Sequence, residues 1–168
     1  MKRILFIISV FLTLSASVGA QAPIRDVFKQ MPDSILPYLS QANRLDFLDF
    51  LDSSMKAEVT NLLDGKSEMT ALTSDSLSIR LNGVTRLDML LVDASSLVRP
   101  DSVMQVVYMI KTYQIAGNQD EHSVSCFTTS WTPLLPDQFA VTDKKKAAML
   151  ANLGCPSSPY FYDKVKNN

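Results

Sequence analysis

The chain has 168 residues, of which 46% are hydrophobic and 20% are charged, and its formal net charge is −1. This length suits a single domain with a hydrophobic core of its own. A near-neutral charge argues against a surface for nucleic acid or for anionic membranes, both of which attract strongly basic proteins. The sequence has one histidine, which excludes metal sites built on paired histidines.

Residues 1–20 have the pattern of a secretory signal peptide. Lys2 and Arg3 precede the apolar run Ile4–Leu14, and small residues then lead to a cleavage site after Ala20. The apolar run is shorter than the ~20 residues that a membrane-spanning helix needs. We therefore expect export, with a single α+β domain over residues 21–168 and no membrane span after signal cleavage.

The region after the signal peptide begins with helical patterns. Apolar residues recur at helical spacing between Ile24 and Met31, and Pro32 ends this segment. Ser40 is placed to cap a longer helix, which we expect to reach Leu63. Asp64-Gly65 would then end that helix.

The middle of the chain changes to a period of two, which is typical of strands. Met69–Leu72 forms a weak strand, and apolar residues alternate with polar ones through 77–91 around the hairpin signal Asn82-Gly83. A long strand over 104–113 and a return over Val124–Trp131 follow, joined by a loop at 116–122. These patterns predict four or five short antiparallel strands.

The end of the chain predicts one more helix, over Asp143–Leu153, with Thr142 as its cap and Gly154 just beyond its end. Helices grouped before strands favour the α+β class over a parallel α/β sheet. The expected fold is N-terminal helices packed on a four- or five-stranded antiparallel meander sheet, with a C-terminal helix.

The two cysteines, Cys126 and Cys155, both belong to the exported part of the chain. Export permits a disulfide between them. The alternative is two separate buried thiols. Their spacing is unlike that of a CxxC redox motif.

The stretch RLDFLDFLDSSMK places an aspartate at every third position, at Asp46, Asp49 and Asp52. On a helix these aspartates lie opposite Phe47 and Phe50, which is where an amphipathic helix meets water. Two carboxylates can also divide the acid and base roles of a hydrolase. Three aspartates are too few for a calcium site. We favour a solvated face, keep an acidic site as the alternative, and expect no metal.

Other motifs indicate no catalytic centre. The sequence DGKS at 64–67 lacks the earlier glycine of a phosphate-binding loop, because Thr60 takes its place. His122 has no GxSxG partner, and on a strand it would lie ~13 Å from Cys126. The run KKK at 144–146 is typical of a solvated helix. No motif implies a cofactor, so none is expected.

Three stretches resemble a known family: MPDSILPYL, NRLDFLDFLDSSMKAEVTNLLDGKSEMTALTSDSLSIRL and WTPLLPDQF, at 31–39, 43–81 and 131–139. Together they are similar to a domain-of-unknown-function family of exported Bacteroidales proteins. The resemblance implies a protein of the periplasm or cell surface of a Gram-negative bacterium. It implies no catalytic residue and no ligand.

The function expected from the sequence is an exported, non-catalytic binding or regulatory module of the cell envelope. The exposed edges of a meander sheet can accept a strand from a partner, here an envelope protein. One alternative is an envelope hydrolase that uses paired carboxylates, drawn from Asp46, Asp49, Asp52, Asp88 and Asp93. Another is a binder of small apolar ligands, with an enclosed pocket between the helices and the sheet.

Overall fold

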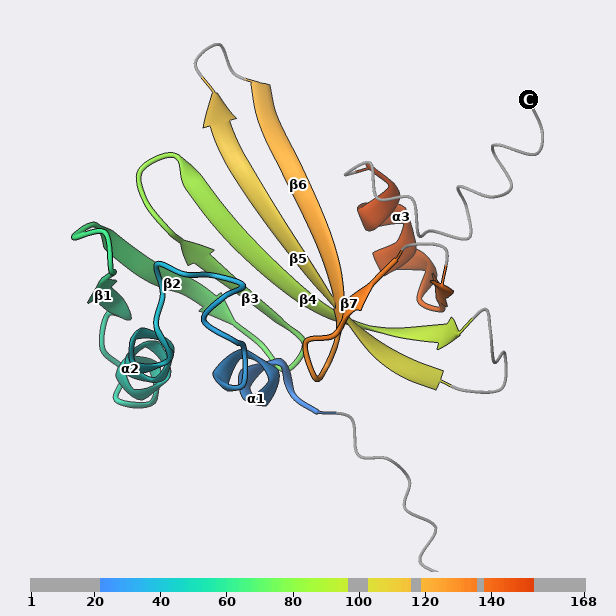
Figure 1. The fold of residues 1–168 in the computed structure, drawn as a ribbon, viewed down its shortest axis with the longest axis horizontal. Coiled ribbons are helices and arrows are strands. Elements are labelled where there is room, and N and C mark those ends of the chain that lie inside the picture. The colour runs from blue at the N-terminus through green and yellow to red at the C-terminus, as the bar shows by residue number, and fades with distance from the viewer. Residues whose placement is uncertain (1–21, 97–102, 116–118, 136–137, 153–168) are drawn as a thin grey trace, which may run out of the picture.

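The computed structural model describes residues 22–96, 103–115, 119–135 and 138–152 (Figure 1). The signal-peptide pattern therefore lies outside the described residues. No helix of the described part is long and apolar enough to cross a membrane. The elements run in the order α1 (Ile24–Lys29), α2 (Gln41–Asp52), β1 (Glu58–Thr60), β2 (Lys66–Leu72), β3 (Ser76–Arg80), β4 (Thr85–Ser96), β5 (Val103–Ile115), β6 (Gln119–Thr128), β7 (Pro133–Leu134), β8 (Phe139–Val141) and α3 (Lys144–Asn152).

All described strands belong to one antiparallel sheet. Strands β1 to β7 are neighbours in chain order, and β8 leaves this path to pair with the end of β4. The strand β4 pairs with β5 from Thr85↔Tyr113 to Ser95↔Val103. Two strands pair with the other edge of β4: β3 pairs with its first half, and β8 pairs with its last residues. Strand β4 therefore pairs with three other strands, β3, β5 and β8.

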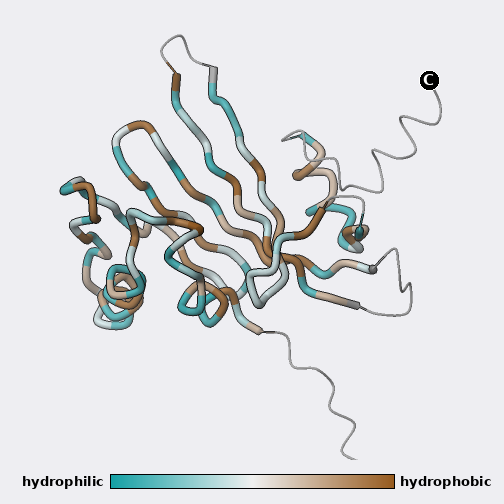
Figure 2. Tube along the Cα trace, in the orientation of Figure 1, coloured by the Kyte–Doolittle hydropathy of each residue, from teal (hydrophilic) through white to brown (hydrophobic). Residues whose placement is uncertain are grey.

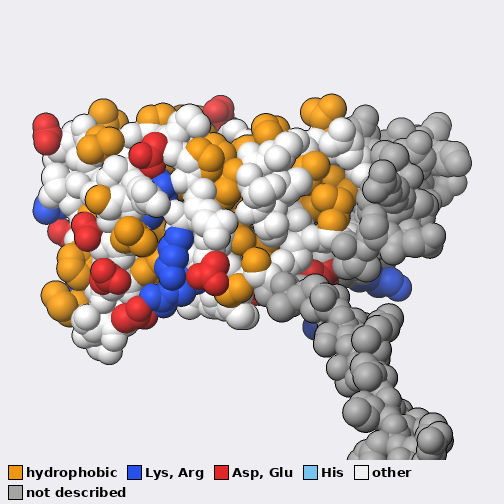
Figure 3. Space-filling model, turned by 60° about the horizontal axis from the view of Figure 1, so that its bottom comes forward, with side chains coloured by type: hydrophobic (Ala, Val, Ile, Leu, Met, Phe, Trp, Pro, Cys, Tyr) orange, Lys and Arg blue, Asp and Glu red, His pale blue; other side chains and the backbone are white. Residues whose placement is uncertain are grey.

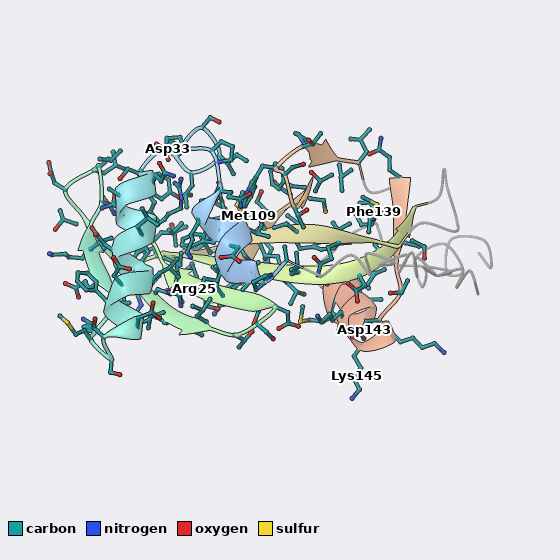
Figure 4. The ribbon with its side chains drawn as sticks, turned by 90° about the horizontal axis from the view of Figure 1, so that it is seen from below. Arg25, Asp33, Met109, Phe139, Asp143 and Lys145 are labelled. Atoms are coloured by element: carbon teal, nitrogen blue, oxygen red, sulfur yellow. The ribbon has the colours of Figure 1, made fainter. Side chains whose placement is uncertain are left out.

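The helices α1 and α2 cover one face of the sheet. Phe28 of α1 and Phe47 of α2 are fully buried in one core, which also contains Leu87, Met89 and Leu91, the residues that alternate along β4. Figure 4 shows the two helices lying across the sheet, with Met109 near α1. Burial of each phenylalanine side chain contributes about 1.5–3 kcal/mol.

The helix α3 packs on the opposite face, towards the end of the sheet where β8 pairs with β4, and a second core forms there. In this core Ala147 and Leu150 of α3 lie with Tyr108 of β5 and Phe139 of β8. The rings of Tyr108 and Phe139 meet edge to face, with centroids 6.1 Å apart. Because Val107 is buried in the first core, β5 is covered on both faces along this part.

The helix α2 begins as expected but ends early. Ser40 caps it: the Ser40 Oγ accepts from the Asn43 backbone N–H at 3.2 Å, and the Asn43 Oδ1 accepts from the Ser40 N–H at 3.2 Å. The expected extension to Leu63 is wrong, because Ser54 takes a left-handed φ of 55° just after the helix. Residues 57–60 then alternate between buried and more exposed, which suits the strand β1.

The DGKS segment is part of the β1–β2 hairpin and not a helix stop. The buried Asn61 holds the turn, since its Oδ1 accepts from the backbone N–H of Leu63 at 2.9 Å and of Gly65 at 3.1 Å. Asp64 has a φ of 58°. A Cβ atom at position 65 would lie 3.2 Å from Asn61 Nδ2, which explains the glycine there.

The α+β class, the antiparallel sheet and the C-terminal helix are confirmed, but the strand count is wrong. In the described residues the sheet has eight strands and not four or five, because the patterns did not predict β1, β7 and β8. Strand β6 also begins at Gln119, inside the expected loop. The helix α3 is capped by Asp143, whose Oδ1 accepts from the Lys145 N–H at 2.8 Å, while Thr142 Oγ1 donates to the Asp93 carbonyl.

Candidate functional site

The aspartates of α2 do not share one environment. Asp46 and Asp49 are exposed, whereas Asp52 accepts from both Nη atoms of Arg25 in α1, with 2.8 Å between Nη1 and Oδ1. The hydrogen bond from Arg25 lowers the pKa of the Asp52 carboxyl below its ordinary value. On the side of the molecule that carries α1 and α2, acidic, basic and hydrophobic side chains are intermixed (Figure 3).

The other candidate residues are also apart from one another. Asp88 and Asp93 lie on opposite faces of β4, because they are five positions apart and side chains alternate along a strand. Cys126 is buried in the second core, and Cys155 lies outside the described residues. Within the described ranges, no three His, Cys, Asp or Glu side chains are placed to hold a metal ion.

One long edge of the sheet is open at β6. This strand pairs with β5 over its whole length, from Val106↔Thr128 to Ile115↔Gln119. On its other side, β7 pairs with Cys126 and Phe127, and no described strand covers Gln119–Ser125. The open stretch lies at the end of β6 that follows β5, and Figure 2 shows this end of β6 to be hydrophilic.

The direction of the backbone groups along this edge follows from one hydrogen bond. The Thr128 N–H donates to the carbonyl of Thr132, which lies after β6 in the turn to β7, so the Thr128 backbone points away from β5. Backbone groups alternate in direction along an antiparallel strand. The N–H and C=O groups of Asp120, His122 and Val124 therefore point outward, and no described residue accepts or donates to them.

The open part of β6 carries the acidic residues Asp120 and Glu121 but lacks the other features that usually protect a strand edge. It has no lysine, no proline and no bulge, and its register with β5 is unbroken. The opposite edge of the sheet is different, since β1 has three residues and Lys56 beside it binds Glu58 at 2.5 Å. The edge of β6 is thus the better place for an added strand.

A groove of about 320 Å³ lies beside this edge, on the sheet face opposite α1 and α2. Arg86 and Leu87 are neighbours in β4, so the side chain of Arg86 points away from the core that buries Leu87. Asn82 fixes the rim, because its Oδ1 accepts from the N–H groups of Val84 and Thr85. Five strands, β2 to β6, and one turn line the groove. The strands contribute Thr70, Arg80, Thr85, Arg86, Thr112, Gln114 and Asp120, and the turn contributes residues 82–84.

Two arginines face each other in this groove. Arg80 of β3 and Arg86 of β4 are direct partners in the antiparallel register, so their side chains share one face. The same row continues to Thr112 and His122, whose Oγ1 and Nδ1 atoms are 3.1 Å apart. The sequence contained a signal for the arginine pair, because both residues are three positions from Gly83 in a hairpin that was expected.

Comparisons with known proteins agree with the resemblance seen in the sequence. A solved domain of an uncharacterized protein from Porphyromonas gingivalis W83 is similar to this chain, with a TM-score of 0.52 and 19% sequence identity. The match covers 68% of this chain and 54% of that chain, so this chain spans about half the length of its structural neighbour, and at this identity it shows the fold alone. No curated protein matched the chain. A family model described as "Protein of unknown function (DUF3256)" matches residues 15–167, and the chain therefore belongs to this family.

Proposed function

We propose that the protein is an exported, non-catalytic binding module of the Gram-negative cell envelope, and that it binds an extended segment of an envelope protein along β6. The observation that carries the proposal is the open edge of Gln119–Ser125 with its outward backbone groups. In strand addition, backbone hydrogen bonds provide affinity and alternate side chains provide specificity. The signal-peptide pattern of residues 1–20 supports export.

The side chains along the edge indicate the chemistry of the partner. Asp120 and Glu121 are exposed at the end next to the turn, whereas Val124 is half-buried beside the second core. A partner segment with a lysine or arginine near the acidic pair and an apolar residue near Val124 would complement this gradient.

The two alternative functions find less support in the described residues. A paired-carboxylate hydrolase needs two facing carboxylates, and the groove lining includes that of Asp120 alone. A binder of apolar ligands needs an enclosed pocket between the helices and the sheet, whereas this groove is polar and lies on the opposite face.

The proposal is tested by photo-crosslinking in intact cells. A photoreactive amino acid is placed at Ser123, which is exposed on the open edge. A control carries it at Lys145, which points away from the sheet on α3 (Figure 4). We expect a crosslinked product of defined mass from position 123 that position 145 does not give.

The backbone role is tested by a matched pair of variants at His122, each combined with the probe at Ser123. His122→Ala and His122→Pro both remove the imidazole and its contact with Thr112, but proline also removes the outward N–H. The crosslinked product should persist in His122→Ala and disappear in His122→Pro. Equal yields from both variants would contradict strand addition at this edge.

A further inference from the structure

The arginine pair in the groove is only partly neutralised. Each guanidinium contacts one carboxylate: Arg80 Nη1 lies 3.2 Å from Glu68 Oε2, and Arg86 Nε lies 2.7 Å from Asp88 Oδ2. No described residue binds Arg80 Nη2 or the two Nη atoms of Arg86. Like charges placed directly opposite each other on neighbouring strands repel. An anionic group between them would relieve this repulsion and use the remaining donors.

The other end of the groove carries the opposite charge. Asp120 of β6 pairs in register with Gln114 of β5, next to the row that holds Arg86 and Thr112. Two strand spacings and two residues along the strand separate Arg86 from Asp120, which corresponds to about 12 Å between their Cα atoms. Thr112 and Gln114 line the floor between these charges and offer a hydroxyl and an amide.

The charge balance selects the class of ligand. The two guanidiniums lie among three carboxylates, those of Glu68, Asp88 and Asp120. Glu68 is also 3.8 Å from the ammonium of Lys56. A simple anion would be attracted by the arginines and repelled by this acidic surround. A zwitterion carries no net charge, and its two ends can meet the two ends of the groove. An extended chain rises about 3.3–3.6 Å per residue, so a tripeptide spans about 10 Å.

We propose that the groove binds a short peptide as a zwitterion, with the terminal carboxylate on Arg80 and Arg86 and the terminal ammonium facing Asp120. The volume of about 320 Å³ is at the small end of the range for ligand sites. Both proposals use the side chain of Asp120, but this site also needs the arginine pair on the sheet face, whereas strand addition needs the outward backbone groups of the edge. Either proposal can fail while the other holds.

The ligand class is tested by titrating the purified protein with four probes and following the backbone amide signals by NMR. Triglycine carries both charges at the required separation. Triglycine amide lacks the carboxylate, N-acetyl-triglycine lacks the ammonium, and glycine has both charges too close together. We expect triglycine to bind with signal changes at Arg86, Thr112 and Gln114, and each of the other probes to bind at least tenfold more weakly.

The residues are tested with the variants Arg86→Gln and Asp120→Asn, and with Lys145→Gln as a matched loss of one positive charge far from the groove. Arg86→Gln and Asp120→Asn should each weaken triglycine binding at least tenfold, and Lys145→Gln should leave it unchanged. Arg80→Gln serves as a second variant if Arg86→Gln does not fold. The proposal is overturned if triglycine causes no shifts in the groove, if N-acetyl-triglycine binds as well as triglycine, or if the arginine variants bind normally.

Discussion

Arg25 of α1 and Asp52 at the end of α2 form a two-bonded ion pair that joins the two helices on their outer side. This contact distinguishes Asp52 from Asp46 and Asp49, whose carboxylates have no such partner among the described side chains. The three aspartates share a helical spacing and an exposed face, but only one of them links two elements.

Replacing Asp52 by asparagine should lower stability slightly at neutral pH, because it removes the charge that Arg25 binds. Asp49→Asn should leave the urea midpoint and partner binding nearly unchanged and is the matched control. Urea unfolding of the two variants and of the wild type measures the difference. A greater loss from Asp49→Asn than from Asp52→Asn would contradict this assignment.

The contribution of Asp52 should also depend on pH in one direction. The pKa of its carboxyl is lowered in the folded protein, chiefly by the hydrogen bond from Arg25. A lowered pKa means that the stabilisation is complete above the ordinary pKa of 3.8 and is lost as the pH falls through the folded pKa. The wild type and Asp52→Asn should therefore differ at neutral pH and converge on acidification below about pH 4. If the stability difference between the wild type and Asp52→Asn grew on acidification, the expected pH dependence would be contradicted.

Arg44 is the structural anchor of the loop before α2. Its side chain is 1% exposed, and its Nη atoms donate to the carbonyls of Leu39, at 2.6 Å, and Met31. Asp33 lies 2.9 Å from Nη1 but is largely exposed.

Arg44→Leu should lower the free energy of unfolding by at least about 2 kcal/mol, because two buried carbonyls lose their donors. Asp33→Asn should cost less than about 1 kcal/mol, since its carboxylate is mostly in water. Chemical denaturation measures both values. An Arg44→Leu variant as stable as the wild type would show that water replaces the guanidinium without cost.

Lys146 fastens α3 to the sheet. Its Nζ donates to Asp75 Oδ2 at 2.6 Å and to the Leu91 carbonyl at 3.1 Å. Lys146→Met keeps the apolar stem and removes both bonds, so it should speed amide exchange in α3 by an amount that corresponds to about 1 kcal/mol or less. Exchange in α1 and α2 should not change. Lys145→Met, at an exposed position, is the control and should leave α3 as protected as in the wild type.

The cysteine pairing stays a prediction with a direct test. Cys126 lies in the same core as α3, and α3 ends at Asn152, three residues before Cys155. Three residues of extended chain span about 10 Å. Peptide mapping without reduction should find the two cysteine peptides linked, and reduction should lower stability by about 3 kcal/mol. Alkylation of both thiols without prior reduction would exclude the bond.

The sequence predicted those parts of the fold in which apolar residues recur several times at the spacing of a helix or of a strand. Leu77, Ile79, Leu87 and Met89 alternate over two adjacent strands, and the signal at Asn82-Gly83 placed the hairpin between them. Strands β1, β7 and β8 have two or three residues each, which is too short for any period to appear. The end of α2 depends on a left-handed φ at Ser54, a residue that carries no strong stop signal.

The features of the candidate site were harder to predict because they depend on pairing between distant residues. The edge of β6 is open because β7 pairs with only two of its residues. No pattern in the β6 sequence predicts how far this pairing extends. Burial of Arg44 could not be expected either, since arginine is mostly exposed in proteins. The opposition of Arg80 and Arg86 could have been derived from the hairpin, since both are equidistant from Gly83.

The central claim is tested most directly by residue-resolved amide exchange in β6, without and with the envelope protein that crosslinks at position 123. In the protein alone, the outward amides of Asp120, His122 and Val124 should exchange quickly, while the inward amides of Glu121 and Ser123 are protected by β5. Binding should protect the three outward amides. A partner that binds and leaves these three amides as fast as before would contradict strand addition at this edge.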